Sequence, residues 1–199
     1  VLVVFSLIFY AWGEPVWVSI LIVSSLVDYI NGRVIEKHPE GWQAKAALVS
    51  SLVVNLGLLG VFKYSGMLVE SVNSLTGLSL PVPAFSLPIG ISFYTFQTIS
   101  YVIDVYRGQA RAQRSYWRFF MYVSMYPQLV AGPIVRYTEV AAQIQERQTS
   151  RADFIGGISR FCTGLGKKVL IANLAGDFAS QYLDGDLAAL STAGAWFGL

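Results

Sequence analysis

Charged residues, cysteine and histidine are all scarce in this chain. Only 13% of its 199 residues are Asp, Glu, Lys or Arg, whereas soluble globular domains carry about 25%. The single cysteine, Cys162, excludes a disulfide framework within the chain. The single histidine, His38, lies in a polar stretch beside Pro39, so we predict a solvated residue and no Cys/His metal site. A net charge of +2 gives no reason to expect nucleic-acid binding.

Apolar and aromatic residues dominate instead. Hydrophobic residues make up 54% of the chain and aromatic residues 14%, with five Trp among them, and the mean hydropathy is +0.53. Aromatic residues of this kind gather at membrane–water interfaces. The composition predicts an all-α, polytopic membrane protein. Because the chain starts and stops inside apolar runs and does not begin with Met, we expect residues 1–199 to be one portion of a single domain, truncated at both ends.

Breakers and charged residues divide the first part of the chain into membrane-sized segments. The third apolar segment, 46–62, covers roughly 26 Å at 1.5 Å per residue and just crosses the hydrocarbon core of a bilayer. The expected elements are helices ending at Gly13, over 16–31 and over 46–62, a polar loop over 32–45, a membrane exit at Lys63 and Tyr64, and an interfacial helix over 65–80.

Basic residues predict which connections face the cytoplasm. They gather in the 32–45 loop and between Arg107 and Arg118, and they are absent from 76–86. Cytoplasmic connections of membrane proteins are rich in Lys and Arg. We therefore predict that residues 32–45 and 107–118 lie inside the cell and that residues 76–86 lie outside.

The apolar stretch 117–133 breaks this alternation. It is short, it contains Pro127 and Gly132-Pro133, and both of its flanks are basic. A re-entrant segment that returns to its own side explains these features better than a full crossing, provided that protein or water covers the backbone. After it we expect a polar surface helix over 138–154. An interfacial or internal helix should follow over 154–175, where basic residues interrupt the apolar pattern.

The most informative stretch runs from Leu87 to Gly108. Its polar residues recur at helical spacing and so share one face of a helix that is otherwise apolar. A polar face cannot lie cheaply against lipid, so we predict that it turns to a protein interior or a wet cavity. For Asp104, an alternative is that it marks the membrane boundary and pairs with Arg107. The members of this polar stripe are Tyr94, Gln97, Thr98, Tyr101 and Asp104.

Three strings in this chain resemble the membrane-bound O-acyltransferase family. They are LPIGISFYTFQTISYVIDVYRG, YPQLVAGPIVRYTEVAAQI and RFCTGLGKKVLIAN, in this order and spacing. Within the family, they are most similar to the branch that acetylates alginate and other bacterial polysaccharides. The resemblance implies the N-terminal portion of a ring of tilted helices, with re-entrant and interfacial helices, around a central tunnel. It also implies a multi-pass protein of the bacterial inner membrane.

The resemblance assigns no catalytic residue to this chain. The family's catalytic histidine lies in a later segment, and His38 does not match it. We therefore expect the chain alone to be inactive. By position on the matched strings, the residues expected to line the tunnel are Tyr94, Gln97, Tyr101, Asp104, Gln128, Pro133 and Arg136. For Gln128 and Arg136 a structural alternative stays open, namely capping of the re-entrant turn or binding of lipid headgroups.

The resemblance implies an O-acyltransferase, most simply an O-acetyltransferase. Its donor would be acetyl-CoA or a similar cytoplasmic acyl carrier, used as a substrate and not as a bound cofactor. Its acceptor would be an exopolysaccharide such as alginate, reached through a periplasmic or membrane partner protein. Two alternatives remain from the residues alone. One is a transporter or channel for a small polar solute, although no internal repeat is visible, and the other is a non-catalytic scaffold for a partner transferase.

Overall fold

The computed structural model describes residues 1–83, 87–129, 132–147, 149–184 and 190–198. Within these ranges every regular element is a helix, which confirms the predicted all-α class. The chain forms two compact units, Val1–Arg147 and Gln148–Leu199.

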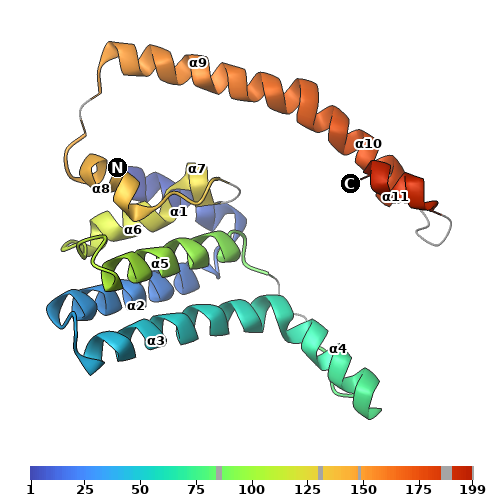
Figure 1. Ribbon diagram of the computed structural model, residues 1–199, viewed down its shortest axis with the longest axis horizontal. Helices are drawn as coiled ribbons and strands as arrows, with labels where there is room; N and C mark the ends of the chain where they lie inside the picture. The colour runs from blue at the N-terminus through green and yellow to red at the C-terminus, as the bar shows by residue number, and fades with distance from the viewer. Residues whose placement is uncertain (84–86, 130–131, 148, 185–189, 199) are drawn as a thin grey trace. The chain divides into compact units, whose positions relative to one another are not determined.

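Three long helices form the centre of the first unit. They are α2 (Val18–Lys37), α3 (Trp42–Leu59) and α5 (Ile91–Tyr106), and each packs against the other two (Figure 1). The shorter apolar helix α1 (Leu2–Gly13) ends at the predicted breaker and packs on α2 and on the segment that follows α5. Two stretches, Val18–Lys37 and Trp42–Thr76, are long and apolar enough to cross a membrane.

The predicted loop over 32–45 is wrong, because α2 continues to Lys37 and only 38–41 connects it to α3. The charged residues Arg33, Glu36 and Lys37 lie on the exposed side of this helix and not in a loop. Gly32 and Ile35 are buried, and a side chain on Gly32 would lie 2.9 Å from Cε1 of Tyr101. His38 follows the last turn of α2 and is partly buried, with its Nδ1 3.4 Å from the carbonyl oxygen of Val34.

The third apolar segment does not end at Lys63 and Tyr64 either. After α3 the chain passes through a π-helical turn, Gly60–Tyr64, and continues as α4 (Ser65–Thr76), making one helical stretch of 35 residues. A π turn inserts an extra residue and commonly bends a helix. Figure 1 shows α4 leaving the direction of α3 at this point. The expected interfacial helix is thus an extension of the preceding one.

The segment after α5 forms a hairpin along that helix. It begins with α6 (Tyr116–Ser124) and, after a break, α7 (Tyr126–Leu129). The ring of Phe119 lies 4.6 Å from that of Tyr101, near the end of α5. At the other end, Leu129 meets Gly90, whose φ of 77° and close approach leave no room for a Cβ atom. The pair α6–α7 therefore runs antiparallel to α5 over its length.

The chain then returns along the same helix. Residues 132–136 are extended and lead into α8 (Tyr137–Gln145). The Tyr122 hydroxyl donates to the carbonyl of Val135 at 2.8 Å, and the ring of Tyr137 lies 5.0 Å from that of Tyr101. The hairpin therefore starts and ends at the same level of α5.

The second unit is a long helix with a short one after it. The expected surface helix over 138–154 is interrupted, since α8 ends at Gln145 and α9 (Arg151–Lys167) begins with a reciprocal cap between Ser150 and Asp153. A π-helical turn, Lys168–Ala172, joins α9 to α10 (Asn173–Leu183), and α11 covers Thr192–Gly198. The hydrogen bonds from Ser150 hold the pKa of Asp153 below its usual value.

Candidate functional site

The polar stripe of α5 lies inside the first unit, as predicted. Tyr94, Gln97, Thr98, Tyr101 and Asp104 are each no more than 3% exposed. The stripe faces the surrounding helices, and the Thr98 hydroxyl donates to the side-chain carbonyl of Asn55 in α3 at 3.4 Å. On the other side of α5, Phe96 is 47% exposed. The polar surface of this helix is therefore turned inward, and Phe96 lies on its outward side.

Two glutamines of the predicted site share one acceptor. The side-chain amide of Gln97 donates to the carbonyl of Tyr122 at 2.9 Å, and that of Gln128 donates to the same oxygen at 2.7 Å. Tyr122 lies in the last turn of α6, where helix carbonyls have no partner within the helix. Gln128 thus has the capping role stated as its alternative, while a role in lining a tunnel stays a prediction.

Asp104 does not pair with Arg107, so this part of the alternative is wrong. Its side chain is only 1% exposed, and among the described residues the single ion pair joins Arg33 to Glu36 at 3.1 Å. The Oδ2 atom of Asp104 has no hydrogen-bond partner in the part of the chain that the structure describes. A buried acceptor left unpaired costs about 1–3 kcal/mol. Such a costly group, inside an apolar helical unit, is a functional candidate.

The remaining predicted residues lie in the extended segment 132–136, which follows α7. Pro133 and Arg136 are exposed, and Arg136 is the residue immediately before α8. The structure therefore separates the seven predicted residues into a packed stripe and an exposed edge. None of them lines the cavities described below.

A second buried carboxylate was not anticipated. Asp28 of α2 is fully buried and accepts from the Asn55 amide at 2.9 and 2.8 Å, and also from the Ser51 hydroxyl. Because Asn55 also accepts from Thr98, this cluster joins α2, α3 and α5. The sequence did contain a signal, namely an acidic residue within an apolar span and two polar residues four positions apart in the next span.

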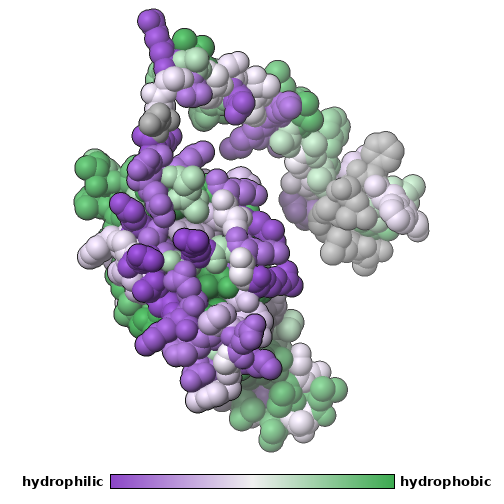
Figure 2. All heavy atoms as spheres, turned by 60° about the vertical axis from the view of Figure 1, so that its left-hand side comes forward, coloured by the Kyte–Doolittle hydropathy of each residue, from purple (hydrophilic) through white to green (hydrophobic). Residues whose placement is uncertain are grey.

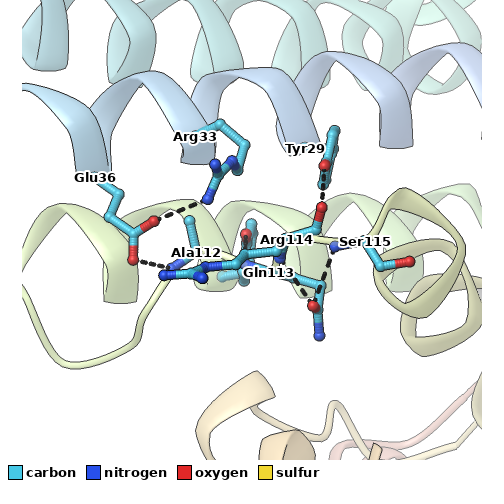
Figure 3. A network of polar contacts seen from close by, with 8 residues as sticks. Tyr29, Arg33, Glu36, Ala112, Gln113, Arg114 and Ser115 are labelled. Atoms are coloured by element: carbon cyan, nitrogen blue, oxygen red, sulfur yellow. Dashed lines mark hydrogen bonds and ion pairs between the residues drawn. The ribbon is translucent and has the colours of Figure 1, made fainter. Parts of the chain in front are cut away.

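The loop between α5 and α6 is held by side chains from three places. Tyr29 of α2 donates to the carbonyl of Arg114 at 2.6 Å, and the Glu36 carboxylate accepts from the backbone N–H of Ala112 at 3.1 Å (Figure 3). Tyr101 of α5 accepts from the N–H of Gln113 at 3.0 Å. These contacts place the two basic connections, at the end of α2 and after α5, at the same end of the unit.

Gln113 completes this arrangement from within the loop. Its side-chain oxygen accepts from the N–H groups of Arg114 and Ser115, at 2.8 and 3.2 Å, and its amide donates to the hydroxyl of Tyr137 at 3.0 Å. Burial raises the pKa of the Tyr137 hydroxyl and the nearby Arg118 opposes that shift, so this hydroxyl is protonated at neutral pH. The loop and the start of α8 are therefore fixed to one another.

Two adjacent cavities open beside this loop. One has a volume of about 420 Å³, the other of about 600 Å³, and both are lined by Glu36 and Arg114. Figure 2 shows hydrophilic residues gathered over much of this end of the unit. The first is also lined by Arg111, Ala112, Gln113, Arg118, Tyr137 and Gln145, and the second by Tyr29, Ile30, Arg33, Val34 and Lys37.

Neither cavity offers a metal site. No group of three or more His, Cys, Asp or Glu side chains within reach of one ion occurs among the described residues. What the arrangement can do chemically is bind anions on arginines and hold buried carboxylates inside an apolar helical unit.

Comparison with known proteins gives the family. The chain is 37% identical over 179 residues to a probable alginate O-acetylase of Pseudomonas syringae pv. tomato, covering 86% of the chain. It is 35% identical over 199 residues to the corresponding Azotobacter vinelandii protein, covering 97% of the chain. The chain is a homologue of the alginate O-acetylases. The resemblance to the membrane-bound O-acyltransferases, and to their alginate-acetylating branch, is thereby confirmed.

A more distant relative is also named as an O-acetyltransferase. It is the peptidoglycan O-acetyltransferase of Helicobacter pylori, 28% identical over 222 residues that cover 98% of the chain. The chain spans only 34%, 39% and 42% of the lengths of these three relatives. No family model matches the chain, and no solved structure does.

Proposed function

We propose that this chain is part of a membrane-embedded O-acetyltransferase that acts in the acetylation of an exopolysaccharide such as alginate. The observation that carries the proposal is the similarity to alginate O-acetylases over 86% and 97% of the chain. The buried polar stripe on α5 and the unpaired Oδ2 atom of Asp104 support it, because polar groups inside an apolar membrane protein are costly and mark functional positions. The relatives' names give no support to the transporter and scaffold alternatives.

The proposed topology is that of a multi-pass protein in the bacterial inner membrane. The α2–α3 turn and the α5–α6 loop lie at one end of the first unit, which agrees with the prediction that both are cytoplasmic. The hairpin of α6, α7 and residues 132–136 returns to its starting level along α5, which supports a re-entrant segment. Helices α1, α2 and α5 pack against its α6 part and cover that backbone, as a re-entrant segment requires.

The proposed reaction needs a general base. The base removes the proton of an acceptor hydroxyl, the oxygen attacks the acetyl carbonyl, and the carrier, a thiol if the donor is acetyl-CoA, leaves with a proton. His38 is poorly placed for this role, because its ring follows the last turn of α2 next to the Val34 carbonyl, away from the stripe. We therefore propose that the base belongs to the later segment in which the family carries its histidine, and that this chain alone is inactive.

The test uses a bacterial strain that makes alginate but lacks its own membrane O-acetylase. Expression of the complete protein should restore O-acetyl groups on the secreted polysaccharide, measured by NMR of the purified polymer. Expression of residues 1–199 alone, confirmed in the membrane by immunoblot, should not. An unacetylated polymer from cells with abundant complete protein would contradict the proposed function, and acetylation by residues 1–199 would contradict the placement of the base.

A further inference from the structure

Three arginines line one cavity without a free carboxylate to neutralise them, two from the α5–α6 loop and one from the first turn of α6. Arg111, Arg114 and Arg118 border the cavity of about 420 Å³, together with one acidic residue, Glu36. The Glu36 carboxylate is already engaged, by the Arg33 guanidinium at 3.1 Å and by the N–H of Ala112 at 3.1 Å. In the described part of the chain, no ion pair involves any of the three arginines.

The loop that carries Arg111 and Arg114 is preorganised. Successive backbone N–H groups from Ala112 to Ser115 donate to side chains of Glu36, Tyr101 and Gln113, at 2.8–3.2 Å. The loop therefore does not have to be ordered when a ligand arrives, and that lowers the entropic cost of binding. A surface whose cations merely meet solvent needs no such support.

The chemistry of the lining selects the ligand. Guanidinium groups match the oxygens of phosphate with two parallel hydrogen bonds, and such charge-assisted bonds are about twice as strong as neutral ones. The adjacent cavity, which shares Glu36 and Arg114, adds Arg33 and Lys37. The two cavities together suit a ligand with more than one phosphate, or a phosphate that continues into an apolar group beside Ile30 and Val34.

We propose that this arginine-lined cavity is a phosphate-binding site. The inference rests on the proposed function, which places this end of the unit in the cytoplasm. There, phosphate can come from a nucleotide-type acetyl donor such as coenzyme A, or from the headgroup of an anionic phospholipid. The recognition chemistry is the same for both sources.

The experiment uses the complete protein in phosphatidylcholine nanodiscs. Three probes are compared by equilibrium binding: radiolabelled coenzyme A, a short-chain phosphatidylglycerol, and an oligouronate that carries carboxylates instead of phosphates. The variant combines Arg111→Gln, Arg114→Gln and Arg118→Gln. The control combines Arg147→Gln, Arg151→Gln and Arg160→Gln, which removes the same charge outside the cavity. Thermal melting of each protein checks that it is folded.

A phosphate site predicts that the cavity variant binds at least one phosphate probe about tenfold more weakly, or worse, and that the control does not. Weaker binding of coenzyme A identifies a donor site, and weaker binding of phosphatidylglycerol identifies a lipid site. If the triple variant unfolds, Arg114→Gln and Arg118→Gln are tested singly, with about a fivefold loss expected for each. Equal loss in the control, no loss for either phosphate probe, or a loss confined to the oligouronate would overturn the proposal.

Acetylation of alginate by the same proteins separates this inference from the proposed function. A complete protein that binds phosphate through these arginines but acetylates nothing would contradict the function alone. A triple variant that acetylates normally and binds both phosphate probes normally would contradict the phosphate site alone.

Discussion

Gln97 of α5 and Gln128 of α7 donate to one carbonyl oxygen, that of Tyr122, at 2.9 and 2.7 Å. The two amides, one from α5 and one from α7, both cap the end of α6. Either can satisfy the oxygen without the other, so their contributions to stability are coupled.

Removing both amides should cost more than the sum of the single losses. Gln97→Leu and Gln128→Leu should each lower the free energy of unfolding by about 1 kcal/mol, the net value of one hydrogen bond. The double variant leaves a buried carbonyl unpaired, and its loss should exceed the sum by about 1 kcal/mol. The free energies of unfolding of the complete protein and its three variants, measured in detergent, form a double-mutant cycle that gives this coupling. Strict additivity would show that Tyr122 has another partner.

Activity should depend on the inner face of α5 and not on its outer face. Tyr101→Phe removes the acceptor of the Gln113 N–H, so it should destabilise the α5–α6 loop by about 1 kcal/mol and lower acetyl transfer. Gln97→Leu should also lower transfer. Phe96→Leu, on the 47% exposed residue, should change it little at equal protein abundance. Equal losses from both faces would mean that this helix matters for packing alone.

Two helical glycines should respond in opposite directions to alanine. A Cβ atom on Gly32 would lie 2.9 Å from Cε1 and 3.0 Å from the hydroxyl of the fully buried Tyr101. Gly32→Ala should therefore destabilise the protein by about 1–3 kcal/mol. Gly57→Ala in α3 meets nothing within 4 Å and should stabilise by up to about 1 kcal/mol. If Gly32→Ala raises the melting temperature as Gly57→Ala does, Tyr101 can move aside.

The buried carboxylate of Asp28 should resist replacement by its amide. Asn55 donates to both of its oxygens, so Asp28→Asn puts one N–H group of the new amide against another donor. We expect a loss of about 1–3 kcal/mol in stability. Ser51→Ala, which removes only one of the donors, should cost about 1 kcal/mol. A stable Asp28→Asn protein with normal abundance in the membrane would show that the cluster tolerates a neutral group.

Cysteine accessibility tests the proposed topology. In a Cys162→Ser background, the exposed sites Glu40→Cys, Gln109→Cys and Glu146→Cys should be shielded from an impermeant thiol reagent in intact cells. Thr76→Cys, at the end of α4, should be labelled and so shows that the reagent reaches the outer face. Labelling of Glu146→Cys from outside would show that the hairpin crosses the membrane.

The pattern of the sequence predicted the α5 stripe because helical spacing and the cost of burying polar groups are both local rules. It failed at residues 32–37, where charged and polar residues looked like a loop. In the structure those residues belong to α2, since Gly32 packs on Tyr101 and Arg33 pairs with Glu36. A local sequence pattern does not predict contacts with a helix that lies far along the chain.

The same limit applies to the candidate site. Gln128 was predicted from its place in a family string, but its acceptor is set by where α6 ends, which depends on tertiary packing. The arginines after α5 were recognised only as a sign of orientation. Their shared cavity appears once Glu36, Tyr101 and Tyr137 are brought together from three other helices.

The π-helical turn Gly60–Tyr64 has a consequence for how this region varies between related proteins. Because such a turn holds one residue more than an α-helical turn, the helix faces before and after it are offset by about 100°. Deleting one residue there would convert the turn to an ordinary α-helical one and leave α3 in register, whereas a deletion in the middle of α3 would rotate Ser51 and Asn55 relative to one another. Single-residue length differences among homologues should therefore collect at 60–64.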